Sequence, residues 1–336
     1  MMLRCTPFSL ALIASISAIT AAPVPNMPPK VTGILVLDNC DAIFRGKEAY
    51  RDNLTFLNTA GKQFFRVTGF NNAESIGCSR MIATDPIRRS VWVIENVAHR
   101  IRRFDYAGKE TLTIADVHGS AIAVDPDTGN AWAVVGRQIG KTKTVVYDDK
   151  GKEVASYDVP GWDIVYDRKA KAFWIADNKL TKISAANGNV LFAVDVSTWC
   201  SSSVDVDPKS GAAWVAVREH SQVVGSCNQL LKFDAVGKPL ATVGMGEKIP
   251  FRVSVDSRNG SIWVANMGKS IERFSAEGKT EAEFPVEALA VQVDPSGNDV
   301  WVVTPDDVRR LTPKGEVIGR FKHASKTSQA WIAALE

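Results

Sequence analysis

The chain has 336 residues, of which 45% are hydrophobic and 23% charged, a balance that is ordinary for a folded protein and excludes disorder as its main state. Its 40 lysines and arginines face 37 aspartates and glutamates, and the net charge of +3 is spread along the chain without a basic block. A dedicated nucleic-acid-binding protein concentrates positive charge on one surface, so we expect no nucleic acid partner. The length suits a single large all-β domain as well as two smaller domains.

The first residues have the composition of an export signal. Met1 to Arg4 is short and positively charged, and residues 7–22 are uncharged and mostly apolar, with small residues near their end. We therefore predict a signal peptide over residues 1–22 and a secreted or periplasmic protein, with an uncleaved membrane anchor as the alternative. A proline-rich lead-in follows over residues 23–30, and nothing later in the sequence is long and apolar enough to cross a membrane.

The rest of the chain is organised by a repeat with a fixed internal offset. In six successive segments an aspartate follows a short apolar stretch, and a tryptophan stands seven residues after it. These pairs are Asp85 and Trp92, Asp125 and Trp132, Asp167 and Trp174, Asp207 and Trp214, Asp256 and Trp263, and Asp294 and Trp301. Successive aspartates are 38 to 49 residues apart. Such a period, with short alternating apolar stretches, is typical of β-propeller blades, so we predict a single propeller domain over residues 31–336.

Each unit of the repeat indicates four antiparallel strands. The first strand ends at the repeat aspartate. The turn that follows, which we call the Asp turn, often has proline directly after the aspartate, and the second strand carries the tryptophan. A second tight turn, which holds a glycine such as Gly108 or Gly237, separates the third strand from the fourth (the Gly turn). Four strands are the usual content of a propeller blade.

The two ends of the chain together supply a seventh unit. Residues 33–38 resemble the tryptophan strand, with Leu35 in place of tryptophan, and residues 54–67 supply the third and fourth strands. The first strand is missing there, whereas an apolar segment, residues 330–335, is left over after the sixth unit. We therefore predict an all-β, seven-bladed propeller of four-stranded antiparallel blades, closed by pairing of its N- and C-terminal strands. A six-bladed ring with loose ends is the alternative.

One unit resembles a known repeat family. Residues 92–109 run from Trp-Val-Ile-Glu through Ala-His-Arg-Ile to Phe-Asp and Gly-Lys, which is similar to the pattern of the NHL repeat, and residues 263–279 match it next best. The resemblance implies a propeller. It does not imply one activity, because similar propellers serve as binding platforms, lactonases, lyases and signalling domains.

The two faces of the predicted ring differ in their variability. The Asp turns and the Gly turns share one face, the turn face, which is monotonous in sequence. The connections between strands two and three and between successive blades share the other, the long-loop face, which holds the longest segments, residues 39–53, 136–143 and 218–229. Insertions on one face of a repeat array usually mark its binding side. We therefore expect a monomer that binds a protein or a small-molecule ligand through the long-loop face.

Four cysteines remain after the predicted signal, and all of them fall on the long-loop face. Cys78 and Cys200 each stand seven residues before a repeat aspartate, whereas Cys40 and Cys227 lie in the two longest loops. An even number of cysteines in an exported protein favours disulfides. Proximity in the ring predicts the pairs Cys40–Cys78 and Cys200–Cys227, although sequence cannot prove the connectivity.

The first strands carry polar residues on the side that faces the axial channel. Asp163, Asp205 and Arg252 occupy such positions in three consecutive units, and His118 and Glu287 enter their strands at equivalent places near the mouth of the channel. These residues indicate either a polar binding funnel or an internal charge pair. His118 is a candidate general base in the first case and an ordinary surface histidine in the second.

A second polar set stands at the ends of the tryptophan strands. Asp38, Glu95, Asp177 and Asn266 each lie three residues after the tryptophan or its equivalent. Oxygen ligands converging on the axis would suit calcium, and the arrangement resembles the metal site of gluconolactonase-type propellers. The alternative is that these residues cap their own strands. Two functions thus stay open, a binding propeller without chemistry and a calcium-dependent hydrolase or lactonase.

Overall fold

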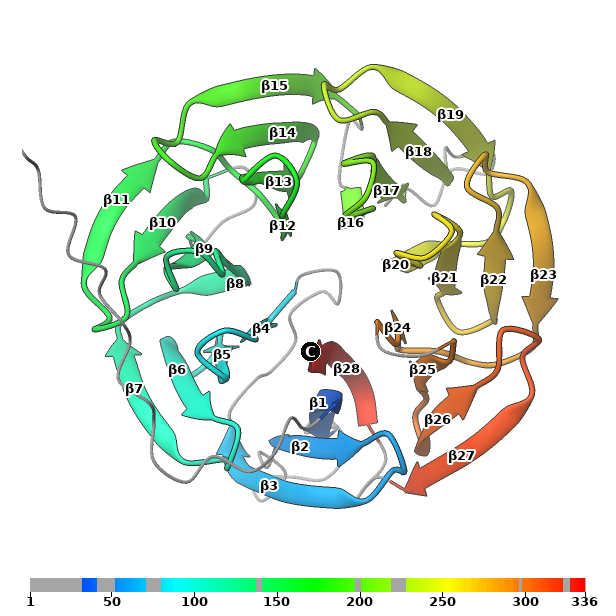
Figure 1. The fold of residues 1–336 in the computed structure, drawn as a ribbon, viewed down its shortest axis with the longest axis horizontal. Coiled ribbons are helices and arrows are strands. Elements are labelled where there is room, and N and C mark those ends of the chain that lie inside the picture. Colours follow the sequence, from blue (N-terminus) through cyan, green and yellow to red (C-terminus); the bar gives the residue numbers. More distant parts are fainter. Residues whose placement is uncertain are drawn as a thin grey trace, which may run out of the picture. The chain divides into compact units, whose positions relative to one another are not determined.

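A computed structural model describes residues 32–40, 52–70, 80–136, 141–196, 201–218, 228–295, 298–322 and 327–335. All of them belong to one compact unit. The predicted signal peptide and lead-in lie outside the described residues. The predicted all-β fold is confirmed, because the described residues form seven four-stranded antiparallel sheets arranged as blades around a ring (Figure 1).

Six blades follow the six repeat units in chain order, and the strands of each blade run from the innermost to the outermost. Blades 1 to 3 are β4 (Ile82–Asp85), β5 (Ser90–Glu95), β6 (Arg100–Asp105) and β7 (Glu110–Ala115); β8 (Gly119–Val124), β9 (Ala131–Val135), β10 (Lys143–Tyr147) and β11 (Glu153–Tyr157); and β12 (Asp163–Asp167), β13 (Ala172–Ala176), β14 (Lys179–Ser184) and β15 (Val190–Asp195). Blades 4 to 6 are β16 (Ser201–Val206), β17 (Ala213–Val217), β18 (Gln229–Phe233) and β19 (Pro239–Gly244); β20 (Pro250–Val255), β21 (Ile262–Asn266), β22 (Ser270–Phe274) and β23 (Thr280–Phe284); and β24 (Ala290–Val293), β25 (Val300–Val303), β26 (Asp307–Leu311) and β27 (Val317–Lys322).

The seventh blade joins the two ends of the described chain. This closing blade consists of β28 (Thr327–Leu335), β1 (Gly33–Cys40), β2 (Asp52–Asn58) and β3 (Gln63–Phe70). β28 pairs with β1 in antiparallel register, with Ile34 opposite Ala334 and Leu37 opposite Trp331. The predicted closure and the count of seven blades are therefore confirmed, and the six-bladed alternative is wrong.

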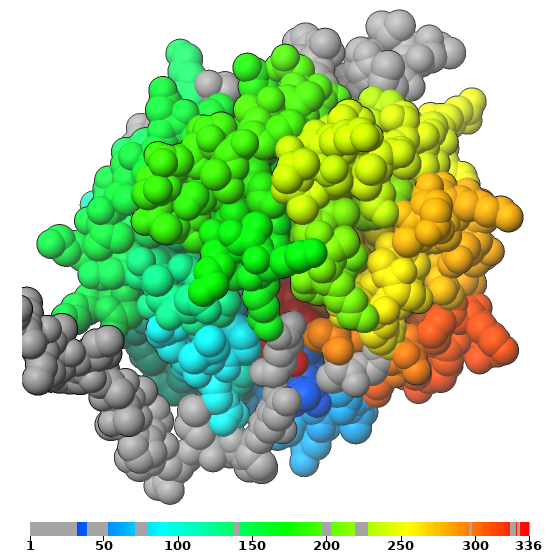
Figure 2. Space-filling model, turned by 45° about the horizontal axis from the view of Figure 1, so that its top comes forward, coloured from blue at the N-terminus to red at the C-terminus, as the bar shows by residue number. Residues whose placement is uncertain are grey.

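The core is built between blades rather than within one sheet. The six repeat tryptophans are at most 2% exposed, and Leu35 is fully buried in the equivalent place of the closing blade. Trp301 of blade 6, for example, packs with Ile34, Val36 and Ala330 of the closing blade in one buried cluster. Burying apolar side chains on both faces of the sheets holds the blades side by side. In the surface view, successive blades lie directly against each other (Figure 2).

The repeat aspartate organises the Asp turn that follows it. The Asp85 carboxylate accepts the backbone N–H groups of Ile87 and Arg88, both at 3.0 Å. In two other blades the carboxylate of the repeat aspartate also accepts the indole N–H of the tryptophan seven residues on. Asp167 accepts from Trp174 at 3.4 Å, and Asp294 accepts from Trp301 at 3.3 Å. In those two blades the carboxylate links the two residues of the repeat directly, and that of Asp167 also caps its turn.

Neighbouring blades are also fastened by cations placed over the tryptophans. In five blades a lysine or arginine of the third strand stands directly across from the tryptophan, and its charged group lies over the indole ring; these cations are Arg103, Lys182, Lys232, Arg273 and Arg310. Lys182 donates to the carbonyl of Ala235, in the Gly turn of the next blade, at 2.8 Å. Lys232, Arg273 and Arg310 reach the corresponding carbonyls of Ala276, Pro313 and Thr59. We refer to these four bonds as the clasps.

The Gly turns fit against the preceding blade. Gly237 has φ of 88°, and a Cβ added there would come within 2.2 Å of the Phe192 ring on the outer strand of blade 3. Gly315 faces Phe284 of blade 5 in the same way, at 2.1 Å. Glycine is therefore required twice, for the left-handed backbone and for the close approach of an aromatic ring.

Candidate functional site

Polar side chains of the inner strands connect successive blades along the axial channel. The Asp163 carboxylate in β12 accepts the backbone N–H of Val204 in β16, at 3.0 Å, and the hydroxyl of Ser203, at 3.2 Å. Asp205 in β16 accepts the N–H of Val255 in β20 at 2.8 Å. Each polar side chain thus satisfies a backbone donor of the next blade, which an apolar residue at that place would leave unpaired.

Arg80, just before β4, reaches across the channel to these carboxylates. Its Nε lies 3.5 Å from Oδ1 of Asp163, and its Nη2 lies 3.7 Å from Oδ1 of Asp205. The same Nη2 donates to the Val204 carbonyl at 3.0 Å. One guanidinium from blade 1 therefore joins blades 3 and 4 through the centre of the ring.

The charges of this group perturb one another. Burial by itself would lower the pKa of the Arg80 guanidinium, but the nearby charges of Asp163 and Asp205 raise it. Burial raises the pKa of the Asp205 carboxyl, against the opposing influence of Arg80 and of two backbone N–H groups. Arg80 is therefore a fixed positive charge in the channel.

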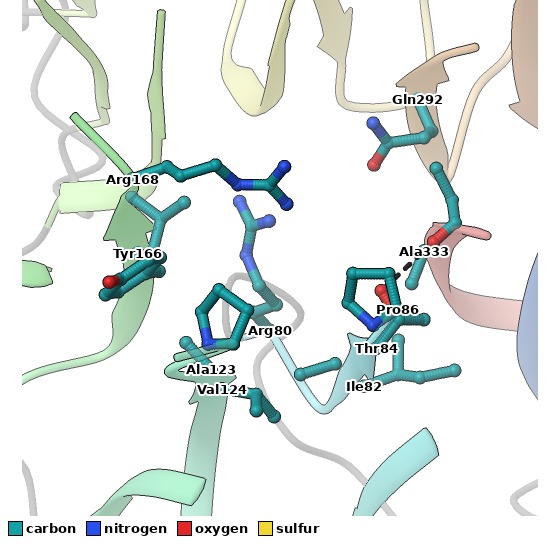
Figure 3. Close-up of a pocket in the computed structure, with 14 residues that line it drawn as sticks. Arg80, Ile82, Thr84, Pro86, Ala123, Val124, Tyr166, Arg168, Gln292 and Ala333 are labelled. Carbon is teal, nitrogen blue, oxygen red and sulfur yellow. Dashed lines mark hydrogen bonds between the residues drawn. The ribbon is translucent and has the colours of Figure 1, made fainter. Parts of the chain in front are cut away.

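Two cavities adjoin Arg80. The larger, of about 210 Å³, opens among the Asp turns, and we name it the turn-side cavity. Its lining includes Arg80, Thr84, Tyr166, Arg168 and Gln292 together with apolar side chains of the inner strands (Figure 3). The smaller cavity, of about 30 Å³, lies among Arg80, Ser203, Arg252 and Trp331 and is the size of one or two water molecules.

Tyr166 and Arg168 flank a repeat aspartate and line the turn-side cavity. In Figure 3 the side chains of Arg168 and Arg80 both extend into the cavity. Burial, with the carboxylates of Asp125 and Asp127, raises the pKa of Tyr166, whose hydroxyl is hydrogen-bonded to Asp125. The phenol therefore stays protonated, and the positive charge of Arg80 in the cavity wall is balanced by Asp163 and Asp205.

The predicted funnel residues separate into two groups. Asp163, Asp205 and Arg252 lie along the channel, the first two bound to Arg80 and the third beside the small cavity. His118 and Glu287 line neither cavity. His118 is partly buried at the entry to β8, where its ring lies 3.7 Å from that of His99, centroid to centroid, and Glu287 is exposed before β24.

The residues predicted as calcium ligands each contact neighbours in their own blade. Asp38 accepts the backbone and side-chain N–H groups of Asn53, and Asn266 donates to Ser270 and Glu272. Glu95 is held by Arg100 at 2.9 and 3.0 Å and by Arg102 at 3.2 Å. Asp177 is buried, which raises the pKa of its carboxyl. Within the described residues, no three His, Cys, Asp or Glu side chains are grouped so that they could hold a metal ion.

Other predictions fall outside the part of the chain that the structure describes. Cys78, Cys200 and Cys227 lie there, and only the backbone of Cys40 is described, so both disulfides stay predictions. Most of the long-loop face lies there too, including residues 41–51 and 219–227. Across the described ranges, no helix combines the length and the apolar character that a bilayer span requires.

The two arginines of the turn-side cavity were not among the site residues predicted from the sequence. A signal for Arg168 exists in the sequence, because four of the six repeat units have proline directly after the aspartate and the unit of Asp167 has arginine. The sequence signal for Arg80 is weaker. Arg80 is a charged residue five positions before a repeat aspartate, but it stands outside the alternating pattern of the strand.

Comparison with known proteins supports the architecture. No family model matches the chain, and no curated protein matches it. Among solved structures, one entitled Kuenenia stuttgartiensis hydrazine synthase has 14% identity and a TM-score of 0.65 over 83% of this chain and 97% of that chain. A functionally unknown protein from Desulfotomaculum acetoxidans DSM 771 has 13% identity and a TM-score of 0.65 over 91% of this chain and 99% of that one.

The fold is that of a seven-bladed β-propeller. At these identities the likeness extends to the fold alone. The resemblance to NHL repeats and to gluconolactonase-type propellers has no support from a family match and rests on the residue pattern.

Proposed function

We propose that this chain is an exported binding module that takes a small molecule in the turn-side cavity. The observation that carries the proposal is the cavity itself, a space of about 210 Å³ at the end of the channel, lined by apolar side chains and a few charged and polar groups. Small-molecule sites have this composition, because apolar walls supply affinity and a few polar groups fix orientation. The proposed binding site is therefore on the turn face and not, as the sequence predicted, on the long-loop face.

A cavity-filling substitution tests this proposal. Ala334 and Tyr166 both line the cavity and occupy equivalent places in their inner strands, so the fold already accepts a large side chain there. Ala334→Phe should abolish the binding of ligands found by an NMR screen of small molecules against the whole chain. Ala193→Phe, on the exposed outer strand β15, is the matched control and should bind normally. Ligands that bind both variants equally would refute the proposal.

Export is part of the proposal and has its own measurement. The apolar run over residues 7–22 supports it. Mass spectrometry of the protein recovered from an export-competent host should show a chain that begins after residue 22. Retention of residues 1–22 would favour the membrane-anchor alternative.

A further inference from the structure

The outermost strands of the seven blades form the perimeter of the ring, and each has one edge that no described strand covers (Figure 1). An uncovered edge exposes backbone N–H and C=O groups that can pair with another strand. Native proteins protect such edges with charged side chains and with proline. Because the blades repeat, the protection of each edge can be compared with that of six equivalents.

The outer strand of blade 3, β15, lacks this protection. In the six other blades the residue directly after the glycine of the Gly turn is charged; these residues are Lys62, Lys109, Lys152, Lys238, Lys279 and Glu316. Blade 3 has Asn189 at this place, and residues 183–194 contain no charged residue and no proline. Among the seven outer strands, β15 is therefore the one that begins without a charge.

The exposed side chains of β15 are apolar. Val190 is 56% exposed and Leu191 is 55% exposed, and Ala193 is exposed as well. Phe192 and Val194, on the other face of the strand, pack toward blade 4. Aliphatic side chains beside an unpaired edge favour the addition of another strand, because pairing satisfies the backbone and buries apolar surface together.

The charges of β15 permit an antiparallel pair of two such strands. Asp195 is the one charged residue of the strand, and its Oδ1 lies 3.8 Å from Nζ of Lys179 in β14. With Phe192 opposite Phe192 of a second copy, the two Asp195 side chains are about 20 Å apart along the pair, beyond the reach of their repulsion at physiological salt. Self-pairing of β23 would instead place Glu281 opposite Glu283 of the second copy, and like charges directly opposite are destabilising.

We infer that the chain forms a dimer in which β15 pairs antiparallel with β15 of a second copy. The sheet of blade 3 then continues into the second ring, and Leu191 of each copy lies against Ala193 of the other. The lining of the turn-side cavity contains no residue of β15, so the pairing leaves that cavity open in both copies. The dimer replaces the monomer expected from the sequence, and it does not depend on the proposed function.

The mass of the purified chain in solution tests the inference. Size-exclusion chromatography with light scattering should give twice the mass of one chain at micromolar concentration. Leu191→Lys introduces a positive charge into the paired edge of each copy and should give the mass of one chain. Val154→Lys is the matched control, because Val154 holds the equivalent place in β11 and is 50% exposed, and it should stay dimeric. Both substitutions are at exposed positions, so both variants should keep the melting temperature of the unmodified ring.

Three results would overturn the inference. The first is an unmodified chain with the mass of one copy. The second is a dimer that persists in Leu191→Lys, because another surface would then join the two copies. The third is loss of the dimer in Val154→Lys as well, because the position of the added charge on the perimeter would then not matter.

Discussion

At the scale of the residue, five of the six repeat aspartates are buried carboxylates whose charge is used by their own turns. Asp256 accepts the backbone N–H of Arg258 at 3.0 Å and its Nε and Nη2, each at 2.7 Å. Burial by itself would raise the pKa of Asp256, but the bonds from Arg258 outweigh it and lower the pKa. A carboxylate with a lowered pKa stabilises the folded state only while it is ionised.

We therefore predict that Asp256→Asn destabilises the protein in a pH-dependent way. At pH 7 the loss should be about 2 kcal/mol, the usual contribution of a hydrogen bond to a charged group. The stabilisation is fully present above the unfolded pKa of about 4 and is lost as the pH falls through the lower folded pKa, so the two proteins should converge toward pH 3. Urea unfolding from pH 7 to pH 3 measures this, with exposed Asp158→Asn as the control. A constant difference across that range would contradict the prediction.

At the scale of the element, each clasp ties the third strand of one blade to the Gly turn of the next. Arg310 makes the clasp between blade 6 and the closing blade. Its guanidinium lies 5.4 Å from the centre of the Trp301 ring, pairs with Asp299 at 2.6 Å and donates to the Thr59 carbonyl. The contact stabilises the seam where the two ends of the chain meet.

Arg310→Leu should lower the free energy of unfolding by about 2 kcal/mol, because the carbonyl of Thr59 loses a charged donor and the indole loses its cation. Arg320→Leu, on the exposed outer strand β27 of the same blade, should change it by less than about 0.5 kcal/mol. Denaturant unfolding of both variants measures the difference. Equal effects would show that the clasp adds nothing beyond a surface charge.

At the scale of the whole molecule, the ring is closed by one strand. β28 pairs with β1 and also packs between the inner strands of blades 6 and 1. Its removal would expose Ile34, Val36 and Ala290, which are now at most 1% exposed. The energy of closure is therefore concentrated in this short segment of the chain.

We therefore predict that a chain without residues 327–336 no longer unfolds in a single cooperative transition. A synthetic peptide of that sequence, added in excess, should restore the single transition. Thermal unfolding followed by tryptophan fluorescence measures both effects. A scrambled peptide is the control and should have no effect. An unchanged melting temperature in the truncated chain would mean that closure is dispensable.

The fold was predictable because its signals are local. The offset from Asp85 to Trp92, repeated in five more units, reflects one turn and one strand, and the leftover segment 330–335 matches the missing strand of the closing blade. The site was predictable only in part. The alternating pattern indicated that Asp163 and Asp205 face the channel, but Arg80 binds a carbonyl 124 residues away, and no local pattern encodes that contact.

The acidic residues at the strand ends show a second limit of sequence reasoning. Glu95 and Arg100 are partners across two adjacent strands, so their bond depends on the loop between them. A sequence pattern alone does not distinguish a carboxylate that faces the axis from one that faces its own blade. Their use as calcium ligands remains a prediction.

In the closing blade, the paired residues Gly33 and Leu335 occupy the place at which each of the other six blades has its Asp turn. Both ends of the described chain therefore emerge on the same side of the ring as the turn-side cavity, whose wall includes Ala333 and Ala334. An affinity tag or a solid support attached directly after β28 would crowd the entrance for ligands. Immobilisation through an exposed outer strand such as β15 would leave that entrance open.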